Sequence, residues 1–320
     1  MWKYHDLKAK ELKKLYDKVS KQTQNKLQEL FDTFNFTWDT LYDIADTKTK
    51  SRINEYIEQW KEDDLLEGYF STLANNIYNK KRVKNSEILE LVIYSAYMWE
   101  QNKLKKQEQE IMLEETRYYY KQGYDEVHKI KKDIPPFSIM DGAMFFILLQ
   151  QALYNGYTYE QNIQATMQYN VQQIYKQTVY NIQQKKAVEI NSDEFQRIFD
   201  LQNNQRLCIN GDKISGFIDN AMIGINNLAK IEGMRQATGE DVIKVKFIAV
   251  TDKNSTEMCQ SMNNMIFYVN KDNEFKRYWG ETKGALAMMK VKVKGLVMGV
   301  NLPPISHYIH HCRSTITYQV

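Results

Sequence analysis

Apolar residues recur every three or four positions from residue 1 to about residue 130, and lysines fill many positions between them. The opening stretch follows this pattern with Trp2, Leu7, Leu12, Leu15 and Tyr16. A second stretch repeats it with Leu27, Leu30, Phe31 and Phe34. This spacing places apolar side chains on one face of a helix. We therefore expect helix after helix here, with the apolar stripes packed as core.

Local signals suggest where some of these helices begin and which faces meet water. Thr37 or Asp39 is suited to cap the helix that carries Leu41 and the apolar residues after it. The charged stretch 103–115 predicts a solvated helix face. Further along, Asn191 with Glu194 has the spacing of a capping box and marks the start of another helix.

The paired prolines Pro135 and Pro136 interrupt the helical pattern and mark a hinge or boundary. The apolar run 139–154 after them predicts a buried helix that ends at Gly156. Residues 159–186 keep a period near 3.6 and predict a long amphipathic helix. A further helix is expected from about residue 214 to residue 238, ending near Gly239.

The pattern changes in the last 80 or so residues. Residues 242–250 are β-branched and partly alternating, which is typical of a strand, and further strands are expected at 266–269, 291–300 and 315–318. The fold class expected is mainly α, a long helical N-terminal body with a small C-terminal α+β module. The regions expected are 1–134 (helical), 135–240 (helical) and 241–320 (the α+β module).

Composition narrows the classes of protein. Only 4 prolines and 13 glycines in 320 residues favour long helices, and a net charge of +3 does not by itself indicate a nucleic-acid partner. No secretory signal is visible at the N-terminus, and the run 143–149 is far shorter than a membrane span. We expect a protein made in a cytoplasm, without a membrane partner. Its three cysteines, Cys208, Cys259 and Cys312, argue against a disulfide framework.

Two blocks in the C-terminal region carry a resemblance. The first runs from residue 247 through Asp252 and Cys259 to Phe267, and the second contains Pro303, Pro304, His310, Cys312 and Arg313. In order, spacing and position they resemble the C-terminal signature of the minor head, or head morphogenesis, proteins similar to phage Mu protein F. The likeness covers about residues 225–318, and the helix at 229–237 stands where that family has one.

The resemblance implies an architectural function and no enzymatic activity. A phage or prophage minor head (minor capsid) protein takes part in head morphogenesis and is a virion component. It is associated with the portal protein and other head proteins. On this interpretation the chain is made in the bacterial host cytoplasm and ends in the head interior or at the portal vertex, where packaged double-stranded DNA is a further partner.

The same residues leave two chemical alternatives open. Cys259, His310 and Cys312 are residue types that bind zinc, but many relatives have a second Cys where this chain has Met262. Paired cysteines packed as small apolar side chains explain the same pattern, so no cofactor is expected. Cys259 with His310 would also suit a small Cys/His-dependent enzyme or toxin-like effector.

Cations with interspersed aromatic residues follow the first block. They are Lys276, Arg277, Lys290, Lys292 and Lys294, with Tyr278 and Trp279 among them. Such residues neutralise phosphates and stack on bases, so they are candidates for DNA contact. A solvated strand face, whose lysines protect a sheet edge, is the alternative explanation.

Overall fold

The computed structural model describes residues 2–62, 68–80, 82–150, 158–202, 214–249, 260, 262–272, 275–277, 290–293, 296–299 and 314–320. The chain divides into two compact units that are both discontinuous in sequence. Unit 1 comprises Met1–Glu11, Glu110–Ile163 and Cys208–Val320, and unit 2 comprises Leu12–Gln109 and Gln164–Leu207. The three consecutive regions expected from the sequence stay a prediction.

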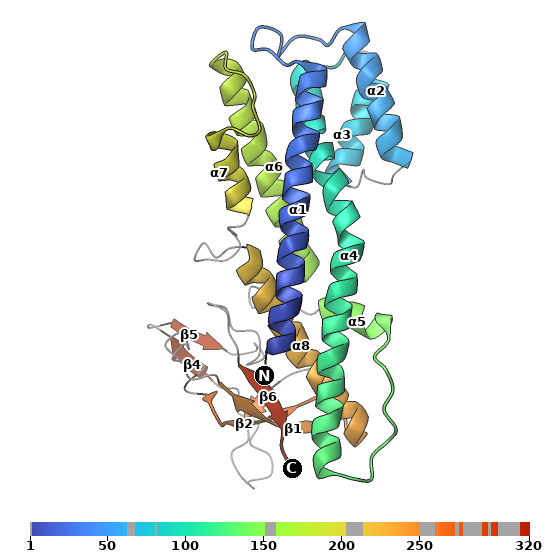
Figure 1. Cartoon of the computed structure of the whole chain (residues 1–320), viewed down its shortest axis with the longest axis vertical. Helices are drawn as coiled ribbons and strands as arrows, with labels where there is room; N and C mark the ends of the chain where they lie inside the picture. The colour runs from blue at the N-terminus through green and yellow to red at the C-terminus, as the bar shows by residue number, and fades with distance from the viewer. Residues whose placement is uncertain are drawn as a thin grey trace. The chain divides into compact units, whose positions relative to one another are not determined.

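The helices, labelled in Figure 1, are α1 (Lys3–Phe34), α2 (Thr47–Glu62), α3 (Gly68–Asn79), α4 (Asn85–Ile130), α5 (Gly142–Leu149), α6 (Tyr159–Gln183), α7 (Asp193–Gln202) and α8 (Ile214–Thr238). The strands are β1 (Ile243–Ile248), β2 (Ile266–Val269), β3 (Phe275–Arg277), β4 (Lys290–Val293), β5 (Leu296–Gly299) and β6 (Thr315–Tyr318). The predicted fold class, mainly α with a small C-terminal α+β module, is confirmed. No helix among the described residues combines the length and apolarity needed to cross a membrane.

Unit 2 is a helical assembly around one hydrophobic core. The core draws on α1, α2, α3, the first part of α4, α6 and α7, and Trp60 and Phe195 are among its largest side chains. Most side chains in residues 88–97 of α4 are buried in this core. Most apolar residues predicted as core over this part of the chain are buried, whereas Ile44 is about half exposed.

Unit 1 contains the remainder of α4, together with α5, α8 and the strands. A four-stranded antiparallel sheet has the order β3-β2-β1-β6, and β4 pairs with β5 as a separate hairpin (Figure 1). Along β1, Ile243, Val245 and Phe247 are fully buried and alternate with half-buried residues. This period of two is the one that predicted the strand. Helix α8 contacts both β1 and β6.

Several helix boundaries differ from those expected. Asp46, and neither Thr37 nor Asp39, caps α2, because its carboxylate accepts a 2.6 Å bond from the Thr49 N–H. Helix α7 begins at Asp193, so the residue in front of it is Ser192 and not Asn191. Helix α8 ends at Thr238 as predicted, with Gly239 in the left-handed region at φ +68°.

Two predictions of burial are wrong in part. Helix α5 occupies only Gly142–Leu149 of the apolar run, and Phe146 and Ile147 on it are about half exposed. Gly156 lies outside the described residues. The stretch 103–115 is not simply a solvated face, because Glu108 and Glu115 are buried in the same helical stripe as Met112. Sequence reasoning took a charge to mean exposure, whereas here the charges have buried polar partners.

Candidate functional site

Helices α4 and α8 cross at two glycines, and this contact positions the sheet of unit 1. A Cβ added at Gly123 would lie 1.9 Å from the Lys230 carbonyl oxygen, and one added at Gly233 would lie 1.9 Å from the Tyr120 carbonyl oxygen. Only glycine allows two helix backbones to approach so closely. The crossing therefore depends on both residues being Gly.

Next to this crossing, a buried ion pair holds strand β6. The Lys230 side chain is 1% exposed, and its Nζ lies 2.6 Å from Glu126 Oε1 and donates a 2.6 Å bond to the Ile316 carbonyl. Glu126 Oε2 in turn accepts from the Tyr318 N–H at 3.2 Å. Burial lowers the pKa of Lys230, against the opposing effect of Glu126. Because each charge has a partner, the pair bridges α4, α8 and β6.

Asn227 adds a second attachment one helical turn away. Its amide nitrogen donates to the Ser314 carbonyl at 3.2 Å, and its oxygen accepts from the Thr315 hydroxyl at 3.0 Å. Asn227 is 1% exposed, so both bonds are made out of water. We call Glu126, Asn227 and Lys230 the β6 anchor. The β6 anchor fixes the residues that follow the second signature block directly.

Strand register brings together the strand that leads into the first signature block and the strand that follows the second. β1 and β6 are antiparallel neighbours, with Phe247 opposite Ile316 and Ile248 opposite Thr315. The chain therefore leaves β1 into the first block at the same end of the sheet where it enters β6 from the second block. Ile248 and Thr315, which are 67 positions apart in the sequence, thus lie opposite each other in one sheet.

A bulge at the end of the β1–β2 pair shapes the return from the first block. Phe247 donates its N–H to the Met265 carbonyl and accepts from the Asn264 N–H, so two residues of one strand face one residue of the other. Asn264 has φ +66°, in the left-handed region that Asn tolerates. The Asn263 side chain accepts from the Ala249 N–H at 3.0 Å. This bond closes the base of the segment between them.

Among the signature residues, the structure describes Phe267. It is 3% exposed on β2, opposite Val245 of β1 and Arg277 of β3, so it is a core residue of the sheet. The other predicted signature residues lie outside the described residues: Asp252, Cys259, Pro303, Pro304, His310, Cys312 and Arg313.

The predicted metal ligands Cys259, His310 and Cys312 are among those undescribed residues. Within the described part of the chain, no three His, Cys, Asp or Glu side chains gather as a metal ion would require. The zinc hypothesis, the expectation of no cofactor and the enzyme alternative that uses Cys259 all stay predictions.

The predicted DNA-contact residues fall in two different sheets. Lys276 and Arg277 belong to β3, at the edge of the four-stranded sheet. Lys290 and Lys292 belong to β4, which pairs with β5. Lys294 lies outside the described residues. Their role in DNA contact stays a prediction.

A buried polar cluster near the N-terminus was not predicted from the sequence. Glu115 is fully buried, and its Oε1 lies 2.7 Å from His5 Nδ1 and accepts a 2.5 Å bond from the Asn226 amide. Trp2 packs against the His5 ring and against Tyr119. Burial, together with the Glu115 charge, raises the pKa of Tyr119. The cluster joins the start of α1 to α4 and α8 within unit 1.

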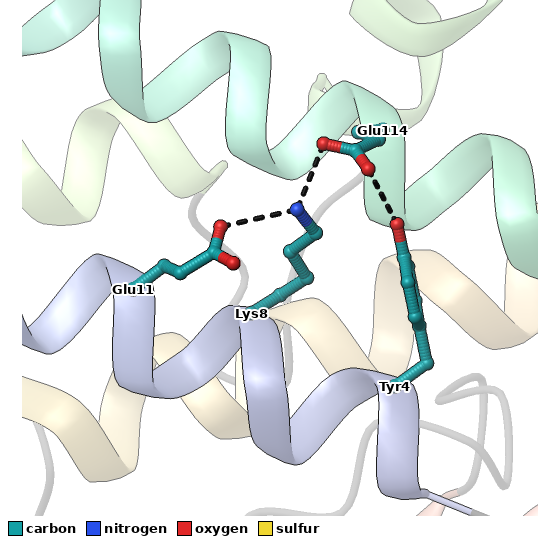
Figure 2. A network of polar contacts seen from close by, with 4 residues as sticks. All are labelled: Tyr4, Lys8, Glu11 and Glu114. Atoms are coloured by element: carbon teal, nitrogen blue, oxygen red, sulfur yellow. Dashed lines mark hydrogen bonds and ion pairs between the residues drawn. The ribbon is translucent and has the colours of Figure 1, made fainter.

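Figure 2 shows a second, more exposed network that joins α1 and α4. Lys8 Nζ donates to Glu11 Oε2 at 3.0 Å and to Glu114 Oε2 at 2.8 Å, and the Tyr4 hydroxyl donates to Glu114 Oε1 at 2.7 Å. Bonds from Lys8 and Tyr4 lower the pKa of Glu114, while partial burial and Glu114 raise the pKa of Tyr4 to about 12. The network ties the first turns of α1 to α4.

The sequence did contain signals for these attachments. Glu108, Met112 and Glu115 lie on one stripe of the helix. Carboxylates on the same stripe as an apolar residue are unusual unless they are buried and paired. Asn226, Asn227 and Lys230 interrupt the apolar stretch 221–231 of α8 in the same way. Buried groups of this kind have polar partners in folded proteins. These partners here are distant in sequence, so their identity was not predictable.

Comparison of the chain with models of protein families, with curated proteins and with solved structures finds no match.

Proposed function

We propose that this chain is a minor head protein of a bacteriophage or prophage, a structural component that acts in head morphogenesis. The observation that carries the proposal is the pairing of β1 with β6. The two signature blocks resemble those of the Mu F-like proteins, and the strand before the first block is the neighbour of the strand after the second. This pairing supports the proposal, because both blocks are connected to the same small sheet.

The described contacts suit an architectural role better than a catalytic one. In the β6 anchor, Lys230 and Glu126 are bonded to each other and to backbone groups, and these contacts hold a strand in place. The helical body supplies the long surfaces with which such a protein would dock on the portal protein and other head proteins. The protein is expected in the virion after its synthesis in the host cytoplasm.

The proposal is tested in the phage or prophage that encodes the chain. Purified particles are analysed by mass spectrometry, and the tagged chain is used to capture the portal protein from induced cells. We expect the chain in particles at few copies and the portal among the captured proteins. Absence from particles together with no capture of the portal would overturn the proposal.

A matched pair of variants tests whether the module carries the role. Gly233→Ala pushes α8 away from α4, whereas Gly142→Ala adds a methyl group that meets nothing within 4 Å. We expect Gly233→Ala to be lost from particles and Gly142→Ala to be retained. Equal incorporation of both variants would show that the C-terminal module is not needed for assembly.

A further inference from the structure

The part of α1 that belongs to unit 2 presents a face of lysines to solvent. Lys13, Lys14, Lys18 and Lys21 are all exposed, and together we call them the lysine face. At 100° per residue they lie within an arc of about 140° around the helix. Leu12, Val19 and Thr23 are buried on the other side. The lysine face is thus the outer surface of an otherwise packed helix.

These four lysines have no acidic partner among the described residues, in contrast to Lys8 and Lys26 of the same helix. Lys8 is paired with Glu11 and Glu114, and Lys26 is paired with Glu29. The four lysines of the face share it with a single exposed acid, Asp17, so its formal charge is four positive against one negative. Uncompensated charge of one sign on a rigid helix repels itself, and an anionic partner relieves that repulsion.

Helix α4 adds positive charge at the same level. The two helices run antiparallel within unit 2, because Tyr16 donates to Glu108 and Lys26 lies over the Trp99 ring. Lys105 and Lys106 of α4 therefore lie level with the part of α1 that carries Lys18 and Lys21. Both α4 lysines are exposed. Lys106 thus adds an exposed cation at the level of Lys18 and Lys21.

The composition of the lysine face distinguishes between two kinds of anionic partner, an acidic protein and a nucleic acid. Protein interfaces are depleted in Lys and depend on apolar or aromatic anchors at their centre. From Lys13 to Asn25 the other exposed positions are Asp17, Gln22 and Asn25, none of them apolar. Phosphate contacts need no such anchor, since lysine acts as a point charge toward a phosphate.

We infer that the lysine face is a sequence-independent binding surface for the phosphate backbone of duplex DNA. Lys13 to Lys21 spans about 12 Å along the helix axis, which covers several phosphates at about 3.4 Å per nucleotide of one strand. The surface is separate from the cations predicted at Lys276 to Lys294. It does not depend on the proposed function, because it concerns the purified chain alone.

The test measures binding of a short labelled DNA duplex of mixed sequence by fluorescence anisotropy, over about 50 to 200 mM salt. The variant under test neutralises the lysine face: Lys13→Gln, Lys14→Gln, Lys18→Gln and Lys21→Gln. The matched control removes the same charge from exposed lysines elsewhere in unit 2: Lys48→Gln, Lys176→Gln, Lys185→Gln and Lys186→Gln. Glutamine retains helix propensity, and circular dichroism checks that both variants are folded.

We expect the first variant to bind about ten-fold or more weakly, and its slope of log affinity against log salt to be shallower by about 3. The control variant keeps most of the slope. Equal weakening in both variants means general charge attraction and overturns the inference. Loss of binding only on neutralising Lys276, Arg277, Lys290 and Lys292 also overturns the inference. Undiminished DNA binding by the first variant, with loss of an acidic protein partner instead, overturns it as well.

Discussion

Replacing Gly233 with alanine tests the crossing of α4 and α8 most directly. The added Cβ would lie 1.9 Å from the Tyr120 carbonyl oxygen, and ordinary contact begins at 3.4 Å. The helices must therefore separate by about 1.5 Å, since neither backbone is compressible. Lys230 lies one turn before Gly233, and its two 2.6 Å bonds would stretch with the movement.

The expected cost combines opposing effects. Overpacking costs about 1 to 3 kcal/mol, and weakening a buried ion pair adds to it, while alanine gains up to about 1 kcal/mol over glycine in helix propensity. We expect a net destabilisation of unit 1 by about 2 to 4 kcal/mol. Hydrogen exchange of backbone amides, read by mass spectrometry in α8 and β6, should quicken by tens-fold to hundreds-fold.

Gly142→Ala is the control for this measurement. It makes the same chemical change at the start of α5, where a Cβ meets nothing within 4 Å, so exchange in α8 and β6 should stay at the wild-type rate. If Gly233→Ala exchanges as slowly as Gly142→Ala, the close crossing of the two helices is wrong.

Three further predictions concern buried polar groups. Glu115→Ala leaves the donors of His5 and Asn226 without their acceptor, so it should lower the free energy of unfolding by about 2 to 4 kcal/mol. Amide exchange at the start of α1 should quicken, and Glu115→Gln should cost less. Equal stability of wild type and Glu115→Ala would contradict this prediction. Burial lowers the pKa of Lys230 below 10.5, so the unfolded chain binds more protons just below that pH, and this residue makes stability rise with pH there. Lys230→Met should remove that rise in urea titrations, and an unchanged slope would contradict the assignment. Burial raises the pKa of Tyr97 to about 12, so the folded chain keeps a proton that the unfolded chain loses near 10, and stability falls between these pH values. Tyr97→Phe should lessen that fall, and an identical alkaline unfolding curve in the variant would refute it.

The periodic signals in the sequence predicted elements well where burial follows a simple repeat. Strand β1 and helix α8 were predicted almost to the residue, because alternating β-branched residues and a terminal glycine specify them locally. Buried polar residues were the main source of error. Glu115 and Lys230 look like surface charges until their partners are known. The partner of Glu115 is His5, 110 positions earlier in the chain. The partner of Lys230 is Glu126, 104 positions earlier and across the α4–α8 crossing.

Chain topology was also beyond the reach of local patterns. Helices α1 and α4 each contribute to both units, so no boundary in the sequence marks where one unit ends. Glycines inside helices usually indicate weak propensity, whereas Gly123 and Gly233 allow a close backbone contact that only the paired helices make visible. The signature residues beyond β1 stay predictions for a different reason, because they lie outside the described residues.

The discontinuity of unit 1 has a consequence for the order of folding during synthesis. Its contacts join Trp2 to Tyr119 and Glu126 to Tyr318, so it requires segments made at widely separated times. All residues of unit 2 are available once the chain has been synthesised as far as Leu207 and has left the ribosome. Folding proceeds domain by domain as the chain emerges, and contacts between distant residues form slowly. The helical core of unit 2 should therefore form first. The start of α1 and the face of α8 that is buried in the folded chain stay exposed until β6 has been synthesised, and chaperones can bind them during that time.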